Sequence, residues 1–569
     1  MALKDVISVA KGDKKADLLL KNGQLVNVLS AEIYPANVAI YKGKVVGIGD
    51  YEAEKEIDLN GKYICPGFID SHIHIESTML SPAEFSKATV SSGTTTVVAD
   101  PHEIANVLGV KGIKYMLDVS KSLPQNIYFV LPSCVPSTKL ETSGASLEAS
   151  DLKPLLKNKR VIGLGEMMNF PGVCSKDEEV LAKIEMALGS NVFIDGHAPG
   201  LTGKDLTAYI NSGIRSDHEC VKLEEAKEKL RLGMHIFVRE GSDAKNMEAL
   251  LPLITPVNSR FFSLCTDDIH PKDLAEGHIN GVLKKAVTLG LDPIIAVQLA
   301  TVNAARHFGF KELGAVAPGY NADITVVNNL HDFKVDIVLK DGEVVAEKGK
   351  AVFQAKQKRK ALVKETIKVK PLKIEDLSVK AKEGNIRVID IIPEQVVTSE
   401  SLEEPNIKDK NVVPNIDKDI LKLAVVERHK ALGRIGIGFV KGFGLRRGAV
   451  AQSVAHDSHN IICVGASDED ILSAVRQVIK LKGGIVVVAG GLVMAELQLS
   501  IAGLLSEGSL LEVHEKIVKL DEAVKELGSG IPDPFGLLSF LALPVIPKLK
   551  LTDKGLVDVA KMEIVDLFE

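Results

Sequence analysis

Short apolar runs alternate with amphipathic stretches through the middle of the chain. Eight of these runs have the length and β-branched content of buried strands, and they span residues 67–74, 95–100, 127–133, 161–166, 192–197, 214–218, 235–240 and 262–267. Helical spacing of apolar residues lies between them, as at 223–232 and 280–289. Eight strands, each followed by a helical segment, predict a (β/α)8 TIM-like barrel. A doubly wound sheet would also fit this alternation, but the eight units and the lack of a phosphate-binding glycine loop favour closure.

The two flanks of this region share a strand–turn–strand pattern. Residues 16–50 predict short strands separated by turns, with Gly23 between the first two. A similar pattern returns at 323–327, 335–340 and 343–346. We therefore predict one small composite β-domain built from residues 1–65 and 311–365, with the barrel of residues 66–310 inserted into it.

The character of the chain changes again near residue 356. A basic Lys-Gln-Lys-Arg-Lys run opens a polar stretch that ends near Lys418. Strands are predicted at 435–440, 461–464 and 485–488, and helices at 467–480 and 510–527. These elements indicate a C-terminal α/β domain over residues 366–569. Its polar cluster, His456 to Asn460, is either an ordinary loop or a segment near the mouth of an active site.

Composition narrows the class of protein. The 569 residues are 46% hydrophobic and 25% charged, and 69 basic and 75 acidic residues leave a net charge of −6. This mixed charge argues against a nucleic-acid or membrane-surface binder. The six cysteines form no C-x-x-C pair, residues 1–15 are polar, and no apolar run reaches membrane-spanning length. We expect free thiols and a cytoplasmic protein.

Polar side chains with metal-binding chemistry stand at the ends of the predicted barrel strands. His72 and His74 are two residues apart on the first strand, so their side chains share one face. The full set is His72, His74, Glu166, His197, His218 and Asp267. The carboxyl ends of barrel strands form the catalytic face of such a fold. Imidazole and carboxylate ligands without thiolate suit Mn²⁺, Fe²⁺ or Zn²⁺.

Longer motifs surround these residues. Over residues 16–365 the chain resembles the amidohydrolase superfamily. The resemblance rests on PGFIDSHIH at 66–74, on the single Glu166, His197 and His218 that follow, and on the closing Asp267. A closer resemblance, to the adenine deaminase family, rests on HIEST (74–78), ADPHEIANV (99–107), GEMMN (165–169), DGHAPG (195–200), SDHE (216–219), CTDD (265–268) and RRGAVAQSVAHDSHN (446–460).

The resemblance implies hydrolysis of adenine to hypoxanthine and ammonia in purine salvage. It implies two divalent ions per chain, with Mn or Fe expected and Zn feasible, which activate a hydroxide that attacks C6. Many hydrolytic amidohydrolases carry a metal-bridging modified lysine on strand 4, whereas this chain has Glu166, whose carboxylate could bridge two metals instead. Asp267 would act as general base and then acid. His218 would either ligate metal or polarise the tetrahedral centre.

Three further residues, Asp100, His102 and Glu103, follow the second strand on the same face. They either contact the purine edge or form a capped loop. The rival functions are another amidohydrolase, acting on a cyclic amide or a different amino-substituted base, and a non-catalytic scaffold barrel. The H-x-E…P-C-x-x-C signature of polynucleotide deaminases is absent, so we expect adenine as partner, with no nucleic acid and no membrane, and a homodimer.

Overall fold

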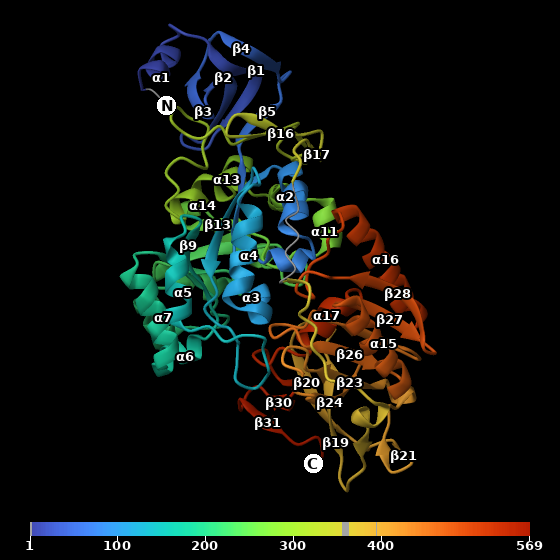
Figure 1. Ribbon diagram of the computed structural model, residues 1–569. Helices are drawn as coiled ribbons and strands as arrows, with labels where there is room; N and C mark the ends of the chain where they lie inside the picture. The colour runs from blue at the N-terminus through green and yellow to red at the C-terminus, as the bar shows by residue number, and fades with distance from the viewer. Residues whose placement is uncertain (1–2, 356–362, 394) are drawn as a thin grey trace.

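The computed structural model describes residues 3–355, 363–393 and 395–569. The N-terminal strands, blue in Figure 1, form one body, the cyan and green elements a second, and the orange and red elements a third beside the second. The basic run at 356–360 lies outside the described residues. Among the helices of the described residues, none is both long and apolar enough to cross a membrane.

The first body is a nine-stranded sheet in the order β17-β16-β15-β14-β5-β1-β2-β3, with β4 paired to β1. Its strands are β1 (Ala16–Asn27), β2 (Glu32–Tyr41), β3 (Lys44–Ile48), β4 (Ala53–Asp58), β5 (Tyr63–Pro66), β14 (Ile324–Val327), β15 (Val335–Lys340), β16 (Glu343–Glu347) and β17 (Lys350–Ala351). The antiparallel pairing of β5 with β14 joins the segments that precede and follow the barrel.

One prediction about this sheet was wrong. The runs on either side of Gly23 form the single strand β1, whose pairing with β2 shifts register between Leu20 and Gly23. A Cβ at Gly23 would lie 2.5 Å from the side chain of Ile64, so a larger residue here would displace that side chain. The glycine therefore marks an irregularity within one strand and not a turn between two.

All eight predicted barrel strands are present. They are β6 (Phe68–Ile73), β7 (Thr94–Ala99), β8 (Asn126–Leu131), β9 (Val161–Met167), β10 (Phe193–Gly196), β11 (Ser216–Asp217), β12 (His235–Arg239) and β13 (Phe262–Cys265). Parallel ladders join β6 through β10 and β11 through β13. The α/β barrel-type fold predicted from the alternation is confirmed.

The two ladders meet at two different seams. Between β13 and β6, the Asp267 amide donates to the His72 carbonyl at 2.9 Å, and the His74 amide donates to the Asp267 carbonyl at 3.2 Å. Between β10 and β11, two hydrogen bonds involve side-chain carboxylates: the Ser216 hydroxyl donates to Asp195 at 2.6 Å, and the Ala198 amide donates to Asp217 at 2.8 Å. Buried carboxylates thus link the two ladders at this seam.

Helices follow most of the barrel strands. They include α2 (Pro82–Ser91), α3 (His102–Leu108), α4 (Val110–Ser120), α7 (Glu178–Gly189), α8 (Gly203–Asn211), α9 (Leu223–Arg231), α11 (Pro271–Glu276), α12 (Ile279–Thr288), α13 (Pro293–Leu299) and α14 (Val302–His307). Sequence signals set their starts: Ser81 caps α2 before a proline, and Asp177 caps α7. The predicted helices at 223–232 and 280–289 match α9 and α12.

The third body contains an eight-stranded sheet in the order β20-β19-β24-β23-β26-β25-β27-β28. Its strands are β19 (Ile386–Ile391), β20 (Thr398–Glu403), β23 (Ile420–Val426), β24 (Ile435–Lys441), β25 (Ala449–Gln452), β26 (Ile461–Gly465), β27 (Gly484–Ala489) and β28 (Leu492–Gln498), with helices α15 (Asp468–Leu481), α16 (Leu510–Glu526) and α17 (Pro534–Phe540). The connection from β25 to β26 carries His456–Asn460 and contacts the barrel, where Asn460 donates to the Thr142 carbonyl at 2.9 Å.

Candidate active site

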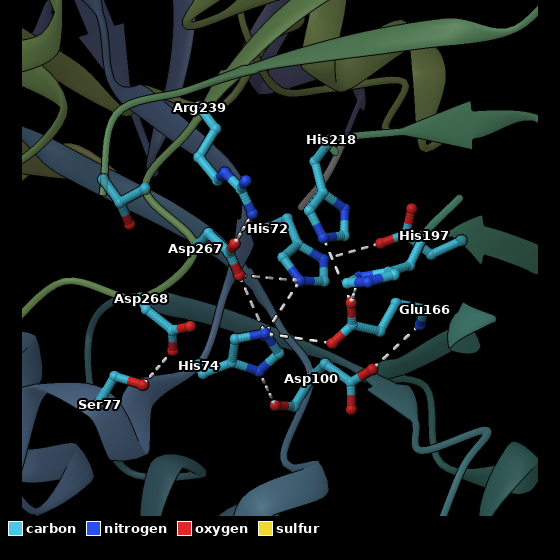
Figure 2. Close-up of polar contacts among 12 residues, drawn as sticks. His72, His74, Ser77, Asp100, Glu166, His197, His218, Arg239, Asp267 and Asp268 are labelled. Atoms are coloured by element: carbon cyan, nitrogen blue, oxygen red, sulfur yellow. Dashed lines mark hydrogen bonds and ion pairs between the residues drawn. The ribbon is translucent and has the colours of Figure 1, made fainter. Parts of the chain in front are cut away.

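The six metal-competent residues predicted from the strand ends converge at the carboxyl end of the barrel (Figure 2). His72 and His74 have their Nε2 atoms 3.2 Å apart. Asp267 Oδ1 lies 3.6 Å from His72 Nε2 and 3.1 Å from His74 Nε2. These three side chains therefore present ligand atoms to one small volume.

Glu166 stands between two groups of imidazoles. Its Oε1 lies 3.3 Å from His74 Nε2 and 3.3 Å from His102 Nδ1. Its Oε2 lies 2.7 Å from His197 Nδ1 and 3.2 Å from His218 Nε2. Each carboxylate oxygen thus faces its own set of histidines, which is the arrangement that a shared metal ligand requires.

Two buried contacts orient the first pair of histidines. His72 Nδ1 donates to Asp195 Oδ2 at 2.8 Å, and His74 Nδ1 donates to the Asp100 carbonyl at 3.0 Å. Because each Nδ1 carries the proton, each Nε2 is left with a lone pair when the ring is neutral. The sequence reasoning missed Asp195 as a partner of His72, although it lies within the DGHAPG run.

Asp267 is held by a basic partner. Arg239 donates to Asp267 Oδ2 at 2.5 Å and also forms an ion pair with Glu219. Arg239 could not be assigned from the sequence, and the structure places it in an ion-pair chain with Glu219 and with Asp267, which follows β13. Glu219 was also missed, although the SDHE run contains it.

The charges in this buried cluster stabilise its carboxylates. Burial favours the neutral carboxyl group, but the imidazoles of His197, His102 and His218 hold the pKa of Glu166 well below its usual range. Burial acts in the same way on Asp267, and the guanidinium of Arg239 outweighs it, so that this pKa also lies well below its usual range. Both groups are therefore anions at neutral pH.

The donor set fits a divalent metal. The buried Nδ1 of His218 has no hydrogen-bond partner among the described residues, while Nε2 of His218 and Nδ1 of His102 face the oxygens of Glu166 at 3.2 and 3.3 Å. A buried polar atom without a partner is costly, and a coordinated cation would satisfy it. The His72–His74–Asp267 and Glu166–His197–His218 groups each bring their ligand atoms within 4.8 Å.

The three residues after β7 occupy the next layer of the site. Asp100 Oδ2 accepts from the Glu166 amide at 3.1 Å, so this carboxylate supports the cluster from behind. His102 Nε2 lies 3.3 Å from Glu103 Oε1, while its Nδ1 faces Glu166. All three begin or precede α3, and all are buried.

The loop from the C-terminal unit completes this layer. His456 Nδ1 lies 2.6 Å from Glu103 Oε1, and His459 Nε2 is bonded to Glu103 Oε2. The Ala455 amide donates to His459 Nδ1 at 3.1 Å, so the proton of a neutral His459 sits on Nε2 and points at Glu103. Burial alone would raise the pKa of Glu103, but His456 and His459 hold it well below its usual range.

Two residues beyond β13 also meet neighbours here. Asp268 accepts a hydrogen bond from Ser77, as Figure 2 shows. His270 lies 3.0 Å from Asp243 and 3.1 Å from Asp533, which ties α11 to the C-terminal unit. The CTDD run contains Asp268, but the distant partner Asp533 carried no sequence signal.

Comparison with known families matches both parts of the chain. The family described as "Amidohydrolase family" matches residues 63–345, and "Adenine deaminase C-terminal domain" matches residues 395–563. The amidohydrolase family implies a divalent metal, in agreement with the candidate ligand groups.

Individual proteins are similar over the whole chain. An adenine deaminase of Kosmotoga olearia is 48% identical, over 100% of this chain and 99% of its own. Adenine deaminase 2 of Carboxydothermus hydrogenoformans is 48% identical, over 99% of each. A solved structure titled as an adenine deaminase is 21% identical, with a TM-score of 0.42, and covers 55% of this chain and 90% of its own.

Proposed function

The chain belongs to the adenine deaminase family, and from this premise we propose that it hydrolyses adenine to hypoxanthine and ammonia. One observation carries the proposal: the six predicted ligands lie together at the carboxyl end of the barrel, with Glu166 between two groups of histidines. A scaffold barrel would have no need for this buried constellation of charge.

The site residues have two proposed roles, which are binding of divalent metal and transfer of protons. His72, His74, Glu166, His197, His218 and Asp267 would hold two divalent ions, Mn or Fe, with Glu166 shared between them. When bound, such ions supply Lewis acidity that lowers the pKa of water and polarises the substrate. Because Asp267 Oδ2 is fixed by Arg239, Asp267 Oδ1 is the oxygen that faces the histidines.

Asp267 performs the proton transfers in this mechanism. Its carboxylate accepts a proton from the attacking water as the new C6–O bond forms. It then returns that proton to the exocyclic amine, the C6–N bond breaks, and ammonia leaves. His218 either helps to hold metal or polarises the developing charge at C6, since its Nε2 faces Glu166 Oε2 at 3.2 Å and its buried Nδ1 has no hydrogen-bond partner among the described residues.

An absorbance assay tests the function directly. The metal-loaded protein should convert adenine to hypoxanthine and release one ammonia for each adenine consumed. Cytosine and dihydroorotate, assayed beside it, should be turned over far more slowly. A preference for either would assign the chain to a different amidohydrolase reaction.

Metal analysis tests the shared role of Glu166. Glu166→Ala should lose at least one metal equivalent, measured by elemental analysis of purified protein, because both histidine groups lose their common carboxylate. Full retention of two metals would exclude a bridging role. Asn169→Ala, which removes the cap of a nearby helix but no proposed ligand, is the control.

The assembly and location stay predictions from the sequence. The proposed reaction needs a small-molecule substrate and no macromolecular partner. Light scattering on the purified chain would test the homodimer, and cell fractionation would test the cytoplasmic location.

A further inference from the structure

A cavity lies between the barrel and the C-terminal unit, beside the metal-ligand cluster. Its empty space is about 610 Å³, a figure that includes open solvent at its mouth. Glu76, Ser77 and Glu103 line it from the barrel, and His456, Leu504 and Phe535 line it from the C-terminal unit.

The cavity wall lies one side chain away from the proposed catalytic residues, none of which lines the cavity itself. His102 lies 3.3 Å from Glu103 on the cavity side and 3.3 Å from Glu166 on the other side. Ser77, which also lines the cavity, donates to Asp268, the neighbour of Asp267 in the chain. One imidazole therefore separates the cavity wall from the shared carboxylate.

Glu103 is the fixed part of this wall. Its Oε1 faces His102 and His456, and its Oε2 is bonded to His459. With three imidazoles around it, this carboxylate has little capacity left for a ligand. It joins the two units and does not serve as the main recognition group.

One carboxylate oxygen of Glu76 is available as a hydrogen-bond acceptor. Its Oε1 accepts from the Ile104 amide at 3.1 Å, whereas its Oε2 is buried without a partner among the described residues. The residue is only 5% exposed and lines the cavity. Since leaving a buried carboxylate oxygen unpaired is costly, a donor supplied by a bound molecule would stabilise this arrangement.

The other walls favour a flat, largely apolar molecule. Met79 and Leu504 contribute apolar side chains, and Phe535 contributes an aromatic one. We infer that this shared cavity binds the purine base, with Glu76 accepting a hydrogen bond from a ring N–H. The inference rests on the proposed function, because that function makes adenine the base. A nucleoside carries ribose at N9, where the free base can carry hydrogen.

The test uses full-length, metal-loaded protein and the variant Glu76→Gln. The amide can keep the bond to Ile104 while it presents N–H in place of the free oxygen, so it opposes the donor on the base. We expect kcat/KM for adenine and the affinity for hypoxanthine, measured by calorimetry, each to fall by about 10- to 100-fold. The loss should be absent with 7-methyladenine or with 9-methyladenine, whichever lacks the contacted N–H. Metal content should stay at the wild-type value.

Glu141→Gln is the matched control. Glu141 is also a buried glutamate with an unpaired oxygen, but it does not line the cavity. Its replacement should leave kcat/KM for adenine unchanged. A second variant, Leu504→Trp, fills the cavity from the C-terminal unit and should raise KM for adenine at least tenfold without loss of metal.

The outcomes separate the inference from the proposed function. Wild-type kcat/KM in both Glu76→Gln and Leu504→Trp would show that the base binds elsewhere. An equal loss with adenine, 7-methyladenine and 9-methyladenine would show that Glu76 does not contact a ring N–H. Loss of metal in Glu76→Gln would make Glu76 a support of the metal ligands. Failure of the wild-type protein to release ammonia from adenine would instead overturn the proposed function.

Discussion

At the scale of single residues, the site depends on which oxygen of each carboxylate is free. Asp267 Oδ2 is engaged by Arg239 and its Oδ1 faces two histidines, whereas both oxygens of Glu166 face imidazoles. The positions of these residues could be predicted because each follows an apolar strand. Their supporting partners could not, since Asp195, Glu219 and Arg239 approach from other strands at distances in sequence that no local pattern encodes.

Asp267→Asn is the sharpest test of the proton-transfer role. The change keeps size and shape but removes the group that accepts a proton from water, so kcat for adenine should fall by roughly 10²–10⁴-fold. KM should move little, because the group acts chiefly in the transition state. The measurement is steady-state deamination alongside metal content. A metal-replete variant within about tenfold of wild-type kcat would mean that another group handles the proton.

At the scale of elements, the strand-and-helix alternation predicted the barrel because each apolar run is buried on both faces. The irregularity in β1 escaped prediction because glycine marks turns and bulges alike. The seam between β10 and β11 also carried no signal, since the bonds of Ser216 and Ala198 to carboxylates form only in the folded chain.

An aromatic and histidine cluster on β10, β12 and α14 predicts how stability responds to acid. The rings of His235 and His307 are 4.2 Å apart, and burial lowers the pKa of His307 to about 4 and that of His235 well below its usual range. Unfolding restores the ordinary value near 6.5, so the unfolded chain binds more protons between about pH 6.5 and 4. Stability contributed by the neutral rings is therefore complete above pH 6.5 and decreases as pH falls through this range.

Replacing His307 should weaken this response. His307→Phe can pack against Phe193 and Phe308, which already contact the imidazole. In wild type, His307 makes the free energy of unfolding fall by up to about 1.4 kcal/mol for each pH unit between pH 6.5 and 4, and the variant should lack this contribution. Melting temperatures at pH 4.5, 5.5, 6.5 and 7.5 should thus decline less steeply in the variant than in wild type. Parallel curves would show that other groups dominate the acid response.

At the scale of the whole molecule, the C-terminal unit is a part of the site. The AHDSHN segment was predicted either as a plain loop or as a segment near the active-site mouth, and the structure places His456 and His459 against Glu103 of the barrel. No pattern of apolar residues could reveal this contact, because it joins residues more than 350 positions apart in the chain.

The position of the cavity between the barrel and the C-terminal unit is expected to determine substrate choice. The base would lie between two units, with Glu103 tied to both, so a ribose attached to the purine would have to displace wall residues. Adenine should be deaminated far faster than adenosine, by at least about 100-fold in kcat/KM if one buried polar contact and a steric clash both oppose the nucleoside. Comparable values for the two substrates would point to a nucleoside enzyme.

The central claim is that water replaces the exocyclic amine of adenine at this metal-ligand cluster. The most direct measurement is the reaction of metal-loaded protein with adenine in ¹⁸O-labelled water, followed by mass spectrometry of the purine product and an ammonia assay. We predict one labelled oxygen in each hypoxanthine, one ammonia for each adenine consumed, and loss of both products in Glu166→Ala. Adenine left intact by the metal-loaded wild-type protein, or hypoxanthine formed equally well by Glu166→Ala, would contradict the claim.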